Sequence, residues 1–229
     1  MNSEGRLREE VLREEVMRAE ICRVGKSLHD RGYVHASAGN ISVRLDDGFL
    51  ITPTDACLGM LNPARLARVD AQGVQTAGDR ASKTLALHRQ IYAADAQARC
   101  VIHTHSTHLV ALTLQGVWSG DDILPPITPY FVMKVGHVPL IPYHLPGDPQ
   151  VAQLVAARMT AMADKGTPLR AVMLSRLGPV AWHRSPTEAS AVLEELEETA
   201  RLWLLCKPAP AALSEAQIDA LRRQFGATW

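Results

Sequence analysis

The chain has 229 residues, of which 47% are apolar and 21% are charged, so we expect residues 1–229 to form a single globular domain. Basic and acidic residues number 24 each, so no charge excess favours nucleic acid or a membrane surface as partner. No apolar run approaches the roughly 20 residues that span a bilayer, and the charged N-terminus is unlike a signal peptide. The four cysteines are widely spaced, which predicts reduced, mostly buried thiols in a cytoplasmic protein.

The first half of the chain combines two helices with several short strands. A period of about 3.6 residues predicts helices, and β-branched runs between turn residues predict strands. In chain order, we expect a helix at 7–29, a hairpin of strands at 40–45 and 48–53, a loop with a helical turn and a short strand at 58–73, a helix at 84–94 and a strand at 99–104.

The second half continues with helices and strands in mixed order. Asp148 and Ser185 are predicted N-caps, each followed by a proline suited to the first helical turn. We expect a helix from about 106, a proline-rich connection at 124–133, a strand at 138–141, a helix at 149–163, two strands within 170–183, and helices at 186–205 and 214–225. This order favours an α/β domain with a substantially antiparallel sheet.

Three histidines lie in or just after the last part of the predicted strand at 99–104. His103 and His105 are separated by one residue, and on a strand this spacing puts both imidazoles on one face, near enough to share a metal ion. His108 falls in or near the next helix and points elsewhere. Catalytic zinc usually has three protein ligands, so this pair alone leaves metal binding and a structural role both open.

Three other segments have the character of anion-binding loops. They are "SAGNIS" at 37–42, "TPTDA" at 52–56 and "GDRASKT" at 78–84. Small residues there leave backbone N–H groups accessible, and the last segment adds Lys83 at the start of a helix. Each loop alone is more often an ordinary turn, but three of them beside the histidine pair favour an anion site.

Together these stretches closely resemble the class II aldolase/adducin family. The resemblance rests on "SAGNISVRLDDGFLITPT", "SKTLALHRQIYAADAQARCVIHTHSTH" and "LGPVAWHRSPTEASAVLEELEETARLWLL". Within the family, "TPTDACLGMLNPARLARVD" and "LPPITPYFVMKVG" are most similar to the 3-oxo-tetronate 4-phosphate decarboxylase branch. The resemblance implies a three-layer αβα fold with a central, mostly antiparallel sheet, and a homotetramer with sites between subunits. It also implies a divalent metal, Zn²⁺ first with Mn²⁺ or Co²⁺ as alternatives, and a phosphorylated sugar acid as substrate.

The resemblance also implies roles for individual residues. His103 and His105 match metal ligands, and Tyr130 matches a tyrosine that acts as an acid from a neighbouring subunit. Lys83 is a further catalytic candidate, because its cation suits a phosphate or a developing enolate. The positions that match the phosphate-holding loops of the family are Ser37, Gly39, Asn40, Thr54, Ser82 and Lys83.

Two positions depart from the family's pattern. The third metal histidine precedes a glycine in the family, and Leu177 stands there in this chain. The family's catalytic glutamate follows a Ser-Ser or Ser-Lys pair, and Thr84 stands in its place. Leucine ligates no metal, and threonine is a poor acid–base group near neutral pH. His144 is the candidate for a replacement third ligand, because an aromatic residue is expected at its position in relatives.

These departures bear on which reaction is expected. A retro-aldol reaction needs a base, whereas decarboxylation of a β-keto acid mainly needs an acceptor for negative charge, which a metal provides. We therefore expect a carbon–carbon lyase, with decarboxylation of a 3-oxo-tetronate 4-phosphate as the favoured reaction. The alternatives are a non-catalytic member that binds a ligand or stabilises an oligomer, and an enzyme of altered chemistry.

Overall fold

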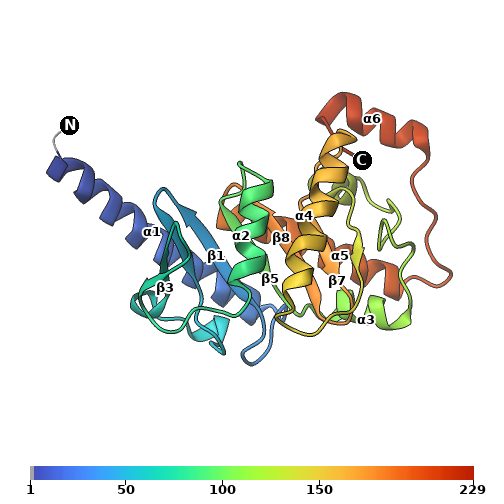
Figure 1. Cartoon of the computed structure of the whole chain (residues 1–229). Coiled ribbons are helices and arrows are strands. Elements are labelled where there is room, and N and C mark those ends of the chain that lie inside the picture. Colours follow the sequence, from blue (N-terminus) through green and yellow to red (C-terminus); the bar gives the residue numbers. More distant parts are fainter. Residues whose placement is uncertain (1–2) are drawn as a thin grey trace.

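A single mixed sheet forms the centre of the computed structural model, which describes residues 3–229 (Figure 1). Met1 and Asn2 of the expected N-terminal segment lie outside the described residues. In the described part, the sheet has the order β4-β3-β2-β1-β5-β8-β7-β6, and every neighbouring pair except β6–β7 is antiparallel. The strands are β1 (Asn40–Leu45), β2 (Gly48–Ile51), β3 (Ala67–Asp70), β4 (Gln75–Ala77), β5 (Cys100–His103), β6 (Leu140–Ile141), β7 (Ala171–Leu174) and β8 (Gly178–His183).

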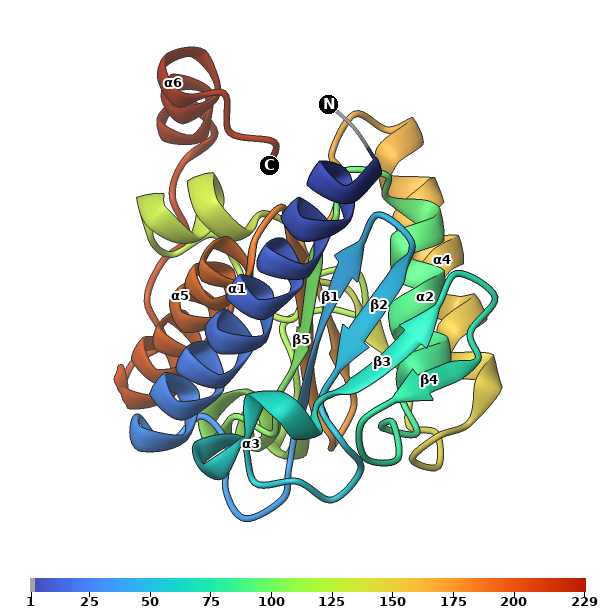
Figure 2. The ribbon, with the colours of Figure 1, turned by 90° about the vertical axis from the view of Figure 1, so that its left-hand side faces the viewer.

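Helices cover both faces of this sheet and confirm the three-layer αβα prediction (Figure 2). One face is covered by α2 (Leu85–Ala94) and α4 (Pro149–Asp164), and the other by α1 (Ser3–Asp30), α3 (Thr107–Gln115) and α5 (Pro186–Leu205). A last helix, α6 (Glu215–Phe225), lies at the edge of the molecule. Within residues 3–229, no helix has the length and apolar character needed to cross a membrane.

Side-chain alternation along β5 divides the core into two layers. Cys100 and Ile102 pack in the cluster beneath α1 and α5, whereas Val101 packs in the cluster beneath α2 and α4. The period of two places His103 on the same side as Val101. This alternation directs the buried histidine toward the α2–α4 layer.

The predicted helix starts are confirmed by their caps. The side chain of Asp148 accepts a hydrogen bond from Gln150 N at 2.9 Å, and Ser185 Oγ accepts one from Glu188 N at 3.2 Å. Each side chain satisfies a backbone donor that has no partner inside its helix. Both caps are followed by the proline at the first helical position.

The structure also differs from the sequence predictions in several places. β5 ends at His103 rather than 104, and β4, whose three residues are all exposed, was not predicted. The proline-rich connection contains a π-helical turn, η3 (Phe131–Val135). All four cysteines are free, but only Cys100 is buried, Cys22 and Cys57 are half-buried and Cys206 is exposed, so the expectation of mostly buried thiols is wrong.

Candidate functional site

Hydrogen bonds hold the three predicted anion-binding loops next to one another at one edge of the molecule. Thr52 N donates to Ile41 O at 3.0 Å, and Ile41 N donates to Thr52 Oγ1 at 3.2 Å. Ser82 N donates to Thr52 O at 3.2 Å, and Thr54 N donates to Arg80 O at 2.9 Å. The fully buried Thr52, which follows β2, therefore links the start of β1 to the segment that leads into α2. Sequence reasoning did not single out this residue.

The first of these loops lies directly against the histidine segment. Asn40, at the start of β1, pairs with His103 in the sheet. Gly39 has a φ of +83°, and a Cβ at this position would lie 2.7 Å from His103 O, so only glycine fits here. The Asn40 side chain is 6% exposed, and its Oδ1 has no hydrogen-bond partner in the described structure. A buried acceptor without a partner is suited to a ligand group that donates a hydrogen bond, such as a hydroxyl or a water molecule.

The two candidate metal ligands lie side by side. The ring centroids of His103 and His105 are 5.0 Å apart. Because β5 ends at His103, this proximity arises from the turn after the strand, and the prediction of one shared strand face is corrected. His35, which sequence reasoning did not identify, lies edge-on to His105 with ring centroids 6.4 Å apart.

The tautomer of His103 is set by the backbone. Its Nδ1 is 2.9 Å from Pro179 O, and a carbonyl oxygen only accepts, so Nδ1 carries the hydrogen. Burial, with a smaller effect from His105, lowers the pKa of His103 to about 4. The imidazole is therefore neutral near pH 7, and its Nε2 lone pair is left for another partner. Metal-binding histidines are commonly held in this way.

The turn between β7 and β8 packs against the same segment and places Leu177. Gly178 closely contacts Thr104 O, at a point where any side chain would collide. Thr104 N also donates to Pro179 O at 3.2 Å. A cavity of about 90 Å³ lies beside these contacts, and Thr84, His103 and Leu177 all border it. We call it the histidine cavity. The two positions that depart from the family's pattern therefore lie on one cavity wall.

His144 borders the histidine cavity as well, on the segment that leads into α4. Its Nδ1 is 3.2 Å from Asp148 Oδ2. A hydrogen bond from the backbone of Gln150, followed by the one from His144, lowers the pKa of Asp148. In the part of the chain that the structure describes, no group of three or more His, Cys, Asp or Glu side chains is arranged to hold a metal ion. A third ligand, His144 included, stays a prediction.

The donors present nevertheless suit a divalent ion. The neutral His103 offers Nε2, and His105 is partly exposed beside it, which gives two imidazole ligands of the type that zinc prefers. A metal at this place would have open coordination positions, since Leu177 and Thr84 contribute no ligand of comparable strength.

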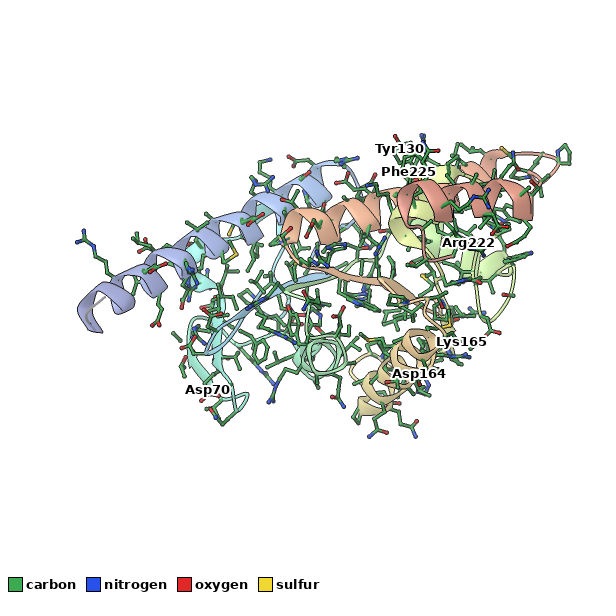
Figure 3. The ribbon with its side chains drawn as sticks, turned by 90° about the horizontal axis from the view of Figure 1, so that it is seen from above. Asp70, Tyr130, Asp164, Lys165, Arg222 and Phe225 are labelled. Atoms are coloured by element: carbon green, nitrogen blue, oxygen red, sulfur yellow. The ribbon has the colours of Figure 1, made fainter. Side chains whose placement is uncertain are left out.

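Tyr130 is not part of this arrangement within the chain. It immediately precedes η3, its side chain is 62% exposed, and Figure 3 shows it at the surface close to α6. The described residues that border the histidine cavity do not include Tyr130. Lys83 borders the cavity and is exposed, Ser82 Oγ lies 3.0 Å from Thr84 Oγ1, and Ser37 lies exposed in the loop before β1.

His108 points away from the pair, as predicted. Its Nδ1 and backbone N contact Glu197 Oε1 at 2.8 and 3.0 Å, and Leu109 N donates to Glu197 Oε2 at 3.1 Å. The buried Glu197 thus binds the first turn of α3 from α5. It was not predicted, because its partners lie on another element and leave no local pattern in the sequence.

Comparison with known families and proteins gives consistent matches. The family model for the class II aldolase and adducin N-terminal domain matches residues 19–204. The chain is 58% identical over 234 residues to a 3-oxo-tetronate 4-phosphate decarboxylase of Cupriavidus necator, with 100% of each chain covered. It is 41% identical over 222 residues to the decarboxylase of the same name in Escherichia coli, with 96% of each chain covered.

Comparison with solved structures gives matches in the same family. The crystal structure of YgbL from Escherichia coli matches with a TM-score of 0.82 and 39% identity, covering 91% of this chain and 99% of that one. An L-fuculose 1-phosphate aldolase matches with a TM-score of 0.77 at 21% identity, covering 92% and 96%, which indicates a common fold.

Proposed function

The chain belongs to the class II aldolase and adducin family, and we propose that it is a carbon–carbon lyase that decarboxylates a 3-oxo-tetronate 4-phosphate to a ketose phosphate and CO₂. The observation that carries this choice among the family's reactions is the histidine cavity itself. It joins His103 and Lys83 to a threonine, Thr84, at the position of the family's catalytic glutamate. Decarboxylation is the reaction that least needs a base at that position.

The joined loops are the proposed phosphate site. The Asn40 side chain is buried at this edge, where its Nδ2 amide group can donate to a phosphate oxygen, and the cation of Lys83 suits a dianionic group. Backbone N–H groups and hydroxyls in turns are typical phosphate donors. The proposed contacts are Ser37, Gly39, Asn40, Thr54, Ser82 and Lys83.

We propose His103 and His105 as ligands of a divalent metal, with Zn²⁺ preferred because both ligands are imidazoles. When bound, the metal supplies Lewis acidity that stabilises negative charge on a ketone oxygen. Pro179 O holds the His103 ring in the tautomer that this role requires. Two protein ligands bind a metal more weakly than three, so we infer that metal affinity rises when the substrate is present.

The exposed position of Tyr130 supports an oligomer. A tyrosine outside the histidine cavity of its own chain can act on a substrate only in a neighbouring copy. We therefore propose Tyr130 as an acid that serves an adjacent subunit of a homotetramer, and residues 1–229 as a single domain built on one sheet. The free cysteines suit a cytoplasmic location.

A second candidate is a non-catalytic member that binds a phosphorylated ligand. The observation in its favour is that Leu177 and Thr84 remove a ligand and a carboxylate from the same cavity. Tight ligand binding that is independent of metal and yields no product would support this candidate.

Release of CO₂ separates the two. The purified protein is supplied with Zn²⁺, Mn²⁺ or Co²⁺ and a 3-oxo-tetronate 4-phosphate, and CO₂ and ketose phosphate are measured. The proposed function predicts equal amounts of both. If the wild-type chain releases none while a Leu177→His, Thr84→Glu double variant does, the native chain is not a decarboxylase.

A further inference from the structure

The histidine cavity contains a second imidazole that the proposed metal site does not use. His144 lies on the segment before α4, and its side chain is 19% exposed. Its Nδ1 is 3.2 Å from Asp148 Oδ2, while Asp148 Oδ1 accepts a hydrogen bond from Gln150 N at 2.9 Å. The cap of α4 therefore fixes the carboxylate, and the carboxylate in turn orients the imidazole.

This pairing sets the hydrogen-bonding state of His144. A carboxylate in contact with a backbone N–H accepts hydrogen bonds, so Nδ1 of His144 donates to Asp148. The opposite ring nitrogen, Nε2, is left for other partners. A histidine oriented by a carboxylate in this way is a common arrangement for moving protons.

Decarboxylation creates a need for such a group. When the bond between the carboxylate carbon and C2 breaks, its electron pair passes into the ketone and CO₂ leaves, which produces an enediolate. The reaction is complete only when C2 takes up a proton. If C2 is not protonated, the same electron pair can expel the phosphate from C4 and break the C4–O bond, which yields inorganic phosphate and a dicarbonyl product.

Other groups on the cavity wall are less suited to this step. Thr84 Oγ1 is 3.0 Å from Ser82 Oγ, and a hydroxyl is a weak acid near neutral pH. The Nδ1 hydrogen of His103 is held by Pro179 O, and its Nε2 is assigned to the metal. Lys83 is assigned to the phosphate. His144 is the remaining imidazole on this wall. The hydroxyl proposed at Tyr130 of a neighbouring copy is assigned to the enediolate oxygen, to which it donates a hydrogen bond, so it does not supply the proton at C2.

We propose that His144, oriented by Asp148, donates a proton from Nε2 to C2 of the substrate after CO₂ has left. The ring takes part as the imidazolium, with its Nδ1 hydrogen on Asp148 and its Nε2 hydrogen facing C2, and the transfer leaves it neutral. Water then returns a proton to the imidazole. This inference rests on the proposed decarboxylase function. It makes His144 a catalytic residue rather than a third metal ligand, and Asp148 a positioning residue.

The test measures three quantities for each variant: CO₂, inorganic phosphate and bound metal. In His144→Gln the imidazole is lost, so protonation of C2 slows by about 10²-fold, as expected on loss of a general acid. CO₂ release should persist, while the ratio of inorganic phosphate to CO₂ should rise at least about tenfold above the wild-type value as expulsion of phosphate competes with this slowed protonation. Metal content, measured with the substrate analogue that carries a hydroxyl in place of the ketone, should equal that of the wild type.

Two further variants separate catalysis from folding. Asp148→Asn keeps an N-cap residue for α4 but removes the charge, and it should raise the phosphate ratio less than His144→Gln does. Tyr143→Phe alters an exposed neighbour outside the cavity and should leave the ratio unchanged.

The outcomes distinguish this inference from the function on which it rests. If His144→Gln keeps the wild-type phosphate ratio at wild-type rate, or if it loses metal, the proposed role of His144 is wrong while the decarboxylase function stands. If the wild-type protein releases no CO₂ under any metal, the decarboxylase function fails and this inference fails with it.

Discussion

Thr84 and Leu177 border the same cavity, one at the start of α2 and the other in the turn between β7 and β8. The two departures from the family's pattern, although far apart in the sequence, therefore both alter the cavity beside His103. The first prediction concerns the metal. Leu177→His should add an imidazole to the pair and lower the metal dissociation constant at least about tenfold.

Equilibrium dialysis with Zn²⁺ measures this change. Leu177→Met, which preserves side-chain volume but adds only a weak thioether ligand, is the matched control and should leave Zn²⁺ affinity near the wild-type value. Equal affinity in the histidine and methionine variants would show that position 177 does not face the metal.

The second prediction concerns Glu197, which joins α5 to the first turn of α3. Glu197→Ala leaves two backbone N–H groups buried without their acceptor, so it should lower the free energy of unfolding by about 1–3 kcal/mol. Chemical denaturation measures the loss. Glu198→Gln, which disturbs only an exposed pair with Arg201, should change stability by less than about 1 kcal/mol.

The third prediction concerns pH. His88 is fully buried with Nδ1 2.7 Å from Ser42 Oγ, and burial, followed by the effect of His103, lowers its pKa to about 3. In the unfolded chain, His88 therefore binds a proton below about pH 6.5, whereas in the folded chain it binds one only below about pH 3. The contribution of His88 to the free energy of unfolding should be fully present above the unfolded-state pKa. It should fall as the pH is lowered from that pKa to the folded-state pKa.

Denaturation at a series of pH values tests this. His88→Asn removes the titrating group, so its stability should depend less steeply on pH between about 6.5 and 3, although it should be less stable than the wild type at pH 7. An identical slope for the two proteins would contradict the burial effect.

The fourth prediction concerns Tyr130. Tyr130→Phe removes the proposed acid and should lower kcat by about 10²-fold without a matching loss of stability, since the side chain is 62% exposed. A mixture of Tyr130→Phe and His103→Ala chains, reassembled together, should regain activity, because some sites then combine an intact pair with a neighbour's intact tyrosine. If exchange of subunits is confirmed but activity does not return, Tyr130 acts in the site of its own chain.

Much of the fold could be predicted from the sequence, because the elements are marked locally. The periodic apolar pattern of α1 and the caps at Asp148 and Ser185 gave helices close to those observed. β4 could not be predicted, because three exposed residues carry no alternation, and η3 depends on packing against α5 and α6. His35 and Glu197 could not be linked to the site, because each meets its partner only through tertiary contacts.

We propose above that His103 and His105 hold a divalent metal together with the phosphorylated substrate. The most direct test is Zn²⁺ binding by equilibrium dialysis, with and without a tetronate 4-phosphate that carries a hydroxyl in place of the ketone. We expect the analogue to raise Zn²⁺ affinity, Zn²⁺ to raise analogue affinity by the same factor, and His103→Ala to abolish both effects. Tight binding of the analogue that is the same with and without Zn²⁺ would contradict the proposal.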